Sequence, residues 1–201
     1  SVNGGFVRLN ASGNVIGENL PFSASLLGKK LSYSLPGLSP ALSKITLDAS
    51  GNLSSQSAVL GIKGFRAEGV PEIRSLTADV TNDAGLIRVK ELEAELRDGS
   101  FVSIAGSSAD LRKGISAALK AKFDLHDFSL LAKDLKGNAS GTVDGTFSMK
   151  GEGFAADLRG LKVTGSLMDL PLTADAALSA DYGKDLPLKV KKHLLQSGST
   201  T

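Results

Sequence analysis

Residues 135–150 alternate without exception between apolar and polar side chains, and this alternation constrains the fold more than any other feature of the sequence. The odd positions read Leu, Gly, Ala, Gly, Val, Gly, Phe, Met, and the even positions read Lys, Asn, Ser, Thr, Asp, Thr, Ser, Lys. Successive side chains of a β-strand point to opposite faces, whereas a helix repeats every 3.6 residues. The segment therefore predicts a strand with one apolar and one solvated face, and it excludes a helix.

The dipeptide Asp144-Gly145 lies inside this segment and is typical of a two-residue hairpin turn. Such a turn would place Val143 opposite Thr146 and would reverse the odd–even phase of the apolar set. The observed phase does not change, which indicates one long strand or a break made by an odd-length loop. Ordinary hairpins that contain a bulge are the alternative.

The same alternation recurs along most of the chain, most clearly at 115–125, 161–167 and 170–182. The apolar phase switches from odd to even between residues 167 and 170, which predicts a two-residue hairpin turn at Met168-Asp169. Further turn signals are Gly13-Asn14, Gly28-Lys29, Gly51-Asn52, Asn82-Asp83 and Asp98-Gly99. The pattern predicts a meander of roughly a dozen strands. Only 108–119, which also fits a strand, and 188–196 could form short helices.

One face of nearly every expected strand is apolar, and leaving it in water would cost about 25 cal/mol per Å². Composition alone favours a β-sandwich, in which two sheets bury their inner faces against each other. Small residues at inward positions, such as Gly141 and Ala176, and an aromatic content of 5% favour a less filled interior. We therefore predict an all-β fold in which a long, curved, mainly antiparallel sheet folds lengthwise around an apolar groove, with the β-sandwich as the alternative.

Charge and chemistry narrow the classes of function. Lys and Arg number 23 and Asp and Glu 21, and the two signs are interspersed along the chain, so no basic stripe for nucleic acid is visible. The chain has no Cys, and it contains no nucleophile elbow, zinc-binding helix or nucleotide-binding loop. We predict a non-enzymatic protein with no catalytic residues, no cofactor and no metal site.

Two groups of titratable residues could suggest chemistry, and both have a simpler interpretation. His126 and His193 are the only histidines and lie far apart in the sequence, which argues against a shared metal or catalytic site. Glu91, Glu93 and Glu95 have a spacing of two, which lays them along the solvated face of one strand. We therefore expect neither group to form a site.

The chain is expected to form a single elongated β domain over residues 1–190, followed by a flexible tail over 191–201. The sequence opens at Ser1 in what reads as a turn and a strand, and its last residues are polar. No apolar run approaches the roughly twenty residues of a membrane-spanning helix. We expect a fragment of a longer protein.

Several stretches resemble the repeating body of TamB and its AsmA-like relatives, a family of bacterial envelope proteins. The main ones are LKAKFDLHDFSLL at 119–131, GTVDGTFSMKG at 141–151 and LRGLKVTGSL at 158–167, followed by LPLTA at 170–174. The segments 47–53, 73–79 and 96–100 have the same cadence. The resemblance covers most of the chain and rests on alternation, Gly and Leu-Pro-Leu.

This resemblance implies a segment of a long protein that is anchored in the inner membrane and extends across the periplasm. Members of the family form a lengthwise-folded sheet with an apolar interior, described as a β-taco. Their associated roles are movement of phospholipid towards the outer membrane and assembly of outer-membrane proteins. The implied partners are phospholipid and, through the parent protein, an outer-membrane barrel protein of the TamA type; nucleic acid is not expected.

The leading hypothesis is a groove that shields or conducts phospholipid acyl chains without a covalent step. Its expected lipid-binding lining consists of apolar residues on the last strands of the meander: Leu119, Phe123, Leu125, Leu135, Ala139, Val143, Phe147, Met149, Leu161, Val163, Leu167, Leu172 and Leu178. The alternative is a non-enzymatic scaffold or chaperone-like module that binds polypeptide strands of outer-membrane proteins at a sheet edge or on the apolar face.

Overall fold

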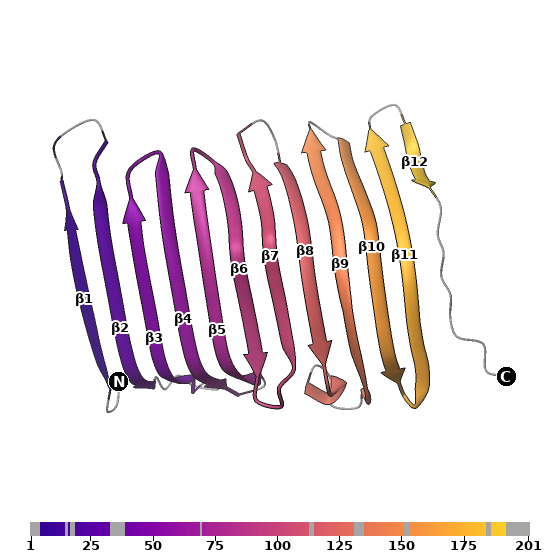
Figure 1. The fold of residues 1–201 in the computed structure, drawn as a ribbon, viewed down its shortest axis with the longest axis horizontal. Coiled ribbons are helices and arrows are strands. Elements are labelled where there is room, and N and C mark those ends of the chain that lie inside the picture. The colour runs from indigo at the N-terminus through magenta and orange to yellow at the C-terminus, as the bar shows by residue number, and fades with distance from the viewer. Residues whose placement is uncertain are drawn as a thin grey trace.

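The computed structural model describes residues 5–14, 16, 19–32, 39–68, 70–112, 115–130, 135–150, 153–183 and 186–191. Within these ranges, twelve strands form one antiparallel sheet whose spatial order is the order of the sequence (Figure 1). The strands are β1 (Phe6–Gly13), β2 (Phe22–Ser32), β3 (Ala41–Gly51), β4 (Ser55–Ala67), β5 (Val70–Asp83), β6 (Leu86–Leu96), β7 (Phe101–Asp110), β8 (Ile115–Leu125), β9 (Gly137–Lys150), β10 (Gly153–Leu167), β11 (Leu170–Gly183) and β12 (Leu186–Lys191). Among the described residues, one 3₁₀ turn, η1 (Phe128–Leu130), lies between β8 and β9. The predicted meander is confirmed.

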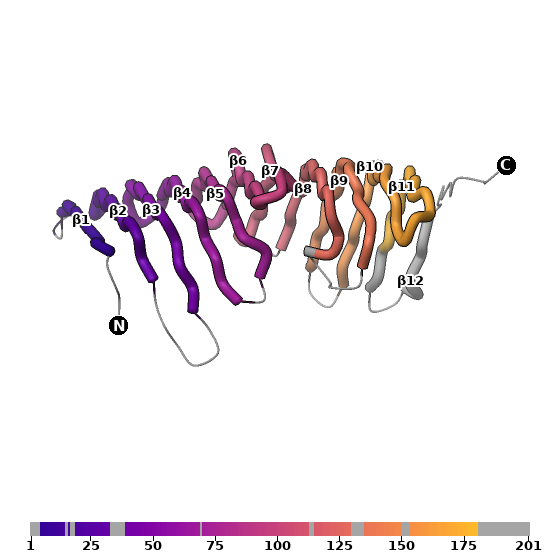
Figure 2. Tube along the Cα trace, turned by 90° about the horizontal axis from the view of Figure 1, so that it is seen from below, coloured from indigo at the N-terminus to yellow at the C-terminus, as the bar shows by residue number. Residues whose placement is uncertain are grey.

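The sheet is open, with β1 and β12 at its two edges. Figure 2 shows that the strands bend along their length, so the sheet is curved rather than flat. All described strands belong to this one sheet, which confirms the curved antiparallel sheet and shows that the β-sandwich alternative is wrong. Most connections between consecutive strands have two to four residues, so each strand pairs with the next one along the chain.

The strand β9 runs through Asp144-Gly145 without a turn, as the unchanged phase predicts. Both residues keep their ladder partners on the two sides, because Gly145 lies opposite Leu119 of β8 and Leu158 of β10. The turn propensity of Asp-Gly is overridden by pairing to two neighbouring strands.

The predicted turn at Met168-Asp169 is confirmed. These two residues join β10 to β11 with φ angles of 51° and 65°, and Leu167 lies opposite Leu170. Positive φ at both central residues is the geometry of a two-residue hairpin whose twist matches that of its strands. The predicted turns at Gly13-Asn14, Gly51-Asn52 and Asp98-Gly99 also fall at strand ends.

One other predicted turn is wrong, and a second is displaced by two residues. Gly28-Lys29 lies inside β2, and Asn82-Asp83 belongs to β5. The turn after β5 consists of Ala84-Gly85, with φ angles of 46° and 91°. Gly at the second turn position tolerates positive φ better than Asp83 would, which explains the shift by two residues.

The helices considered at 108–119 and 188–196 are wrong wherever the chain is described. Residues 108–110 belong to β7, 115–119 to β8 and 188–191 to β12. Strand pairing satisfies the backbone groups on both sides of β7 and β8, which an isolated helical turn would not. Residues 192–196, and the expected tail beyond Lys191, lie outside the described residues.

Bulges or positive-φ residues interrupt the alternation in β2, β4, β5, β6, β7 and β10, and the pairing of β11 with β12 also shifts register between Asp181 and Gly183. In β2, the consecutive residues Lys29 and Lys30 are both exposed, and Lys30 has a φ of 53°. A side-chain atom of Leu31 lies only 2.8 Å from the place of a Cβ on Gly28. Residues three apart in a straight strand are roughly 10 Å apart, so β2 bends towards its apolar side.

Candidate functional site

The apolar residues of successive strands lie opposite one another and form rows that cross the sheet. One row runs through Leu9, Leu26, Leu47, Leu60, Ala78, Leu92, Ile104, Ala121, Val143, Leu161 and Ala176. The next row runs through Val7, Gly28, Ile45, Ile62, Leu76, Ala94, Val102, Phe123, Gly141, Val163 and Ala174. Opposed residues of an antiparallel ladder share a face. The rows therefore form one continuous apolar face from β1 to β11.

The structure places the predicted lining residues together on this face. On β8 and β9, Phe123 lies opposite Gly141 and Leu125 opposite Ala139. The register extends this face over four strands to Leu119, Phe123, Leu125, Ala139, Val143, Phe147, Met149, Leu161, Val163, Leu167, Leu172 and Leu178. Leu135 lies just before β9 and is half-buried. Whether these residues bind lipid stays a prediction.

Three further residues of β10 share the face and were missed by the sequence pattern. Phe154, Ala156 and Leu158 lie opposite Met149, Phe147 and Gly145 of β9. The bulge between Leu158 and Leu161 switches the apolar phase from even to odd positions, so an alternation read from Leu161 does not reach them. Their own alternation over 154–158 is the signal that could have identified them.

Most residues of the apolar face are half-buried within the described part of the chain, and several are exposed. Ala139, 5% exposed, is the one hydrophobic residue there that is fully buried. By contrast Leu119 is 43% exposed and Phe147 36% exposed, although the Phe147 ring stacks on the Phe154 ring with centroids 6.3 Å apart. Apolar patches of this extent are rare on soluble monomers and mark interaction or ligand sites. The face can therefore receive an apolar ligand or another chain.

A shallow hollow deepens the apolar face at its β1–β4 end. It has a volume of about 240 Å³, and its apolar wall includes Val7, Leu31, Leu42 and Phe65. Sites for small molecules usually enclose roughly 300–1,000 Å³. The hollow is thus a local recess of an open surface, and it does not resemble an enclosed active site.

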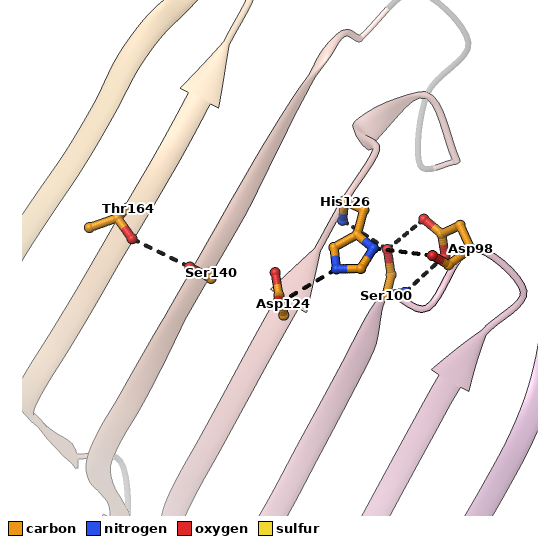
Figure 3. Close-up of polar contacts among 6 residues, drawn as sticks. All are labelled: Asp98, Ser100, Asp124, His126, Ser140 and Thr164. Atoms are coloured by element: carbon orange, nitrogen blue, oxygen red, sulfur yellow. Dashed lines mark hydrogen bonds and ion pairs between the residues drawn. The ribbon is translucent and has the colours of Figure 1, made fainter.

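The opposite face is solvated and carries hydroxyl pairs and ion pairs between neighbouring strands. The Ser140 and Thr164 hydroxyl oxygens lie 3.4 Å apart (Figure 3), and the Arg74 guanidinium donates to the Glu95 carboxylate at 2.9 Å. The predicted placement of Glu91, Glu93 and Glu95 on the solvated face is confirmed, because their partners on β5 are Asp79, Thr77 and Ser75. Glu91 and Glu93 are exposed, and Glu95 is half-buried.

Ion pairing also lowers the pKa of one acid near the start of β5. The Arg66 guanidinium donates to the Glu72 carboxylate at 2.7 Å, and Arg97 donates to it at 3.1 Å. The hydrogen bond from Arg66, followed by the charges of both guanidinium groups, lowers the pKa of Glu72 below its usual value. This carboxylate therefore stays charged and is unsuited to general acid catalysis near neutral pH.

Ser100, His126 and two aspartates meet where β6, β7 and β8 end, and their residue types are those of a catalytic triad (Figure 3). The Ser100 hydroxyl donates to the Asp98 carboxylate at 2.6 Å and accepts from the His126 backbone N–H at 2.8 Å. The His126 ring instead lies 3.1 Å from the Asp98 carbonyl oxygen and 3.6 Å from the Asp124 carboxylate. A nucleophile needs an adjacent base and access to substrate. Ser100 is fully buried and has no bond to the ring, so the cluster fastens a turn.

Replacement of Ser100 by alanine is expected to lower the free energy of unfolding by about 1–3 kcal/mol. The substitution removes the hydroxyl that bonds the His126 backbone N–H and one Asp98 carboxylate oxygen. Denaturant unfolding measures the effect. Ser116→Ala, at an exposed position of β8, is the matched control and should change stability by less than about 0.5 kcal/mol. Equal stabilities of the two variants would show that the cluster does not fasten the turn.

The described residues include neither a cluster of metal ligands nor a helix that could span a membrane. No group of three or more acidic and histidine side chains in those ranges is arranged to hold a metal ion. None of the helices found there has the length and hydropathy needed to cross a bilayer. His193 lies outside the described residues.

The chain matches a known protein family. A family model described as TamB, N-terminal domain, matches residues 6–201. No curated protein and no solved structure matches the chain.

Proposed function

Because the chain belongs to the TamB N-terminal domain family, we propose that its apolar face shields or conducts phospholipid acyl chains towards the outer membrane and so supports outer-membrane assembly. TamB-family proteins are bacterial envelope proteins that span the periplasm, and they work with TamA in outer-membrane assembly. Domains of the family are structural or transport modules. The proposal places this chain in the periplasm, within a protein held at the inner membrane, and requires no catalytic step.

One observation carries the proposal: the apolar rows continue across β1 to β11 without a polar residue. Each methylene group kept out of water is worth about 0.8 kcal/mol, so an acyl chain resists leaving an apolar surface. A chain that moves along these rows exchanges one aliphatic contact for the next. Movement across the sheet then needs no large barrier, while the headgroup stays in water at the open side.

The predicted lining residues on β8 to β11, together with Leu135, form the proposed contact surface. Their side chains are aliphatic or aromatic, and glycines such as Gly141 and Gly145 alternate with them on β9. Small residues between large ones leave shallow depressions that accommodate a flexible hydrocarbon chain. The lining thus supports loose, non-specific contact with acyl chains.

Photo-crosslinking at Phe147 tests the proposal. A photoreactive phenylalanine analogue placed there, in cells, is expected to give phospholipid adducts, because the side chain is exposed on the apolar face. The same analogue at Thr146, which is exposed on the solvated face, is the matched control and should give little lipid adduct. Adducts that contain only protein at Phe147 would contradict lipid shielding.

A polypeptide-binding scaffold is the second candidate, and the edge strand β1 favours it. All eight residues of β1 are exposed, and one side of its backbone has no neighbouring strand among the described residues. Open edges of this kind accept an added strand through main-chain hydrogen bonds. Protein-only adducts at Phe147 would support this function instead.

A further inference from the structure

Three lysines lie side by side on the solvated face of the sheet, and we call them the lysine row. Lys29 of β2 lies opposite Lys44 of β3, which lies opposite Lys63 of β4, and all three are exposed. Neighbouring strands are about 4.8 Å apart, so the three lysine side chains leave the backbone at adjacent positions of the sheet. Like charges directly opposite one another destabilise a sheet. The folded sheet therefore contains a local charge repulsion, which a bound anion would reduce.

The lysine row differs from other charged positions on this face. Elsewhere, neighbouring strands pair opposite charges, as in Arg74–Glu95 at 2.9 Å and Lys90–Asp79 at 3.5 Å. Within the described residues, no carboxylate lies at ion-pair distance from any ammonium group of the row. The nearest acid along β3 is Asp48, four residues from Lys44 and so about 13 Å away along the strand.

The sequence around the row is also basic, although the whole chain is nearly neutral. Residues 6–67 contain the six basic residues Arg8, Lys29, Lys30, Lys44, Lys63 and Arg66, and the two acidic residues Glu18 and Asp48. The bend in β2 places Lys29 and Lys30 on the outer side of the curve. The row thus stands on a convex, positively charged part of the surface, where a broad anionic partner can reach it.

An exposed aromatic side chain lies beside the lysine row on the same face of the sheet. The Phe6 ring is opposite Lys29, whose Nζ lies 5.8 Å from the ring centroid, and Phe6 is 49% exposed. The neighbouring Val7 points to the opposite, apolar face, so Phe6 supplies the apolar contact beside the lysine row. A small soluble anion or an acidic peptide would use only the charges. A bilayer surface offers anionic headgroups and hydrocarbon together, as this corner requires.

We propose that the lysine row docks this end of the sheet on a membrane surface that contains anionic phospholipids. The row acts through charge on the solvated face, so docking does not depend on acyl chains occupying the apolar face. Each basic residue near an anionic membrane strengthens binding by roughly fivefold, and the attraction falls off within a Debye length. Three lysines supply on the order of a hundredfold preference for anionic over neutral membranes.

Vesicle flotation of the whole chain tests docking. The wild type is expected to float with vesicles of phosphatidylcholine and phosphatidylglycerol, and to bind vesicles of phosphatidylcholine alone far more weakly. The triple variant K29Q/K44Q/K63Q should bind the anionic vesicles on the order of a hundredfold more weakly. Salt near 1 M, where the Debye length is about 3 Å, should release the wild type.

A second triple variant, K120Q/K122Q/K162Q, is the matched control. It removes three exposed lysines from the same face at β8 and β10, where Lys120 lies opposite Asp144. Its net charge equals that of the first variant, so any difference between the two reports position. We expect it to float like the wild type. Thermal unfolding should show the lysine-row variant at least as stable as the wild type, because the substitutions remove like-charge repulsion.

Several results would overturn docking. Equal flotation of the wild type with neutral and anionic vesicles would do so, and so would equal losses in the two triple variants. Binding to polyglutamate without flotation would assign the row to an acidic polypeptide instead. Failure of docking is distinguishable from failure of lipid shielding, because Val143→Asp alters the apolar face and should leave flotation unchanged.

Discussion

Replacing Val143 by aspartate is expected to stop acyl chains from crossing the sheet, with lipid adducts at Phe147 reduced on the order of a hundredfold. Val143 stands in the middle of an apolar row, opposite Ala121 of β8 and Leu161 of β10. An unpaired carboxylate facing hydrocarbon costs several kcal/mol. The side chain is only half-buried, so the free energy of unfolding should fall by no more than about 2 kcal/mol.

Thr142→Asp supplies the control for this prediction, on the same strand but the other face. Thr142 is exposed and lies opposite Lys122 and Lys162, so a carboxylate there meets two positive charges. It should leave both lipid adducts and stability near wild type. Global unfolding of the Val143→Asp variant would indicate a sealed core, and unchanged adduct yield would remove the face from any lipid path.

Substitution of Gly165 by valine is expected to destabilise the sheet by about 3 kcal/mol. A Cβ at Gly165 would collide with the Asn138 carbonyl oxygen and lie 2.7 Å from the Ala139 Cα. These are backbone atoms of β9, which cannot rotate away as a side chain could. Relief would require β9 and β10 to separate at their pairing of Gly165 with Ala139.

Gly160→Val is the matched comparison for this second variant. Gly160 lies at the bulge of β10, and a Cβ there would meet no atom within 4 Å. Its substitution should change stability by less than about 0.5 kcal/mol. Denaturant unfolding of both variants measures the two changes in stability. Similar losses would show that the close backbone contact at Gly165 does not limit the pairing of β9 with β10.

Alternation predicts the β-strands and the apolar face well because both depend on a local rule. Successive side chains of a strand point to opposite faces, so the unchanged phase favours one strand for β9 despite Asp144-Gly145, although it leaves an odd-length loop or a bulged hairpin open. Phase also locates the turn at Met168-Asp169 and brings residues as distant as Leu119 and Leu178 to one face. These inferences need no knowledge of tertiary contacts.

Bulges explain most of what the sequence does not predict. At Lys29-Lys30 two successive residues face solvent, which resembles the end of one strand and the start of another. At the bulge after Leu158 the phase switch hides the earlier part of the apolar face. A bulge is stabilised by its partner strand, so a single strand carries little signal for it.

The sequence does not predict the lysine row, and the reason is a different one. Lys29, Lys44 and Lys63 are separated by 15 and 19 residues, and acidic residues elsewhere balance the total charge. Only the pairing of β2 with β3 and of β3 with β4 brings them together. Interspersed charges along a chain therefore do not ensure interspersed charges on a folded surface.

Because the strand order follows the sequence, the width of the sheet across its strands can change without a change in the length of the strands. Each strand pairs only with its neighbours in the chain, so stability is a sum of local terms, as in repeat proteins. Insertion of one complete hairpin would widen the sheet by about 10 Å, and the strands on either side would keep their partners. Such a sheet can be widened or narrowed in steps of one hairpin to match the distance that it must bridge.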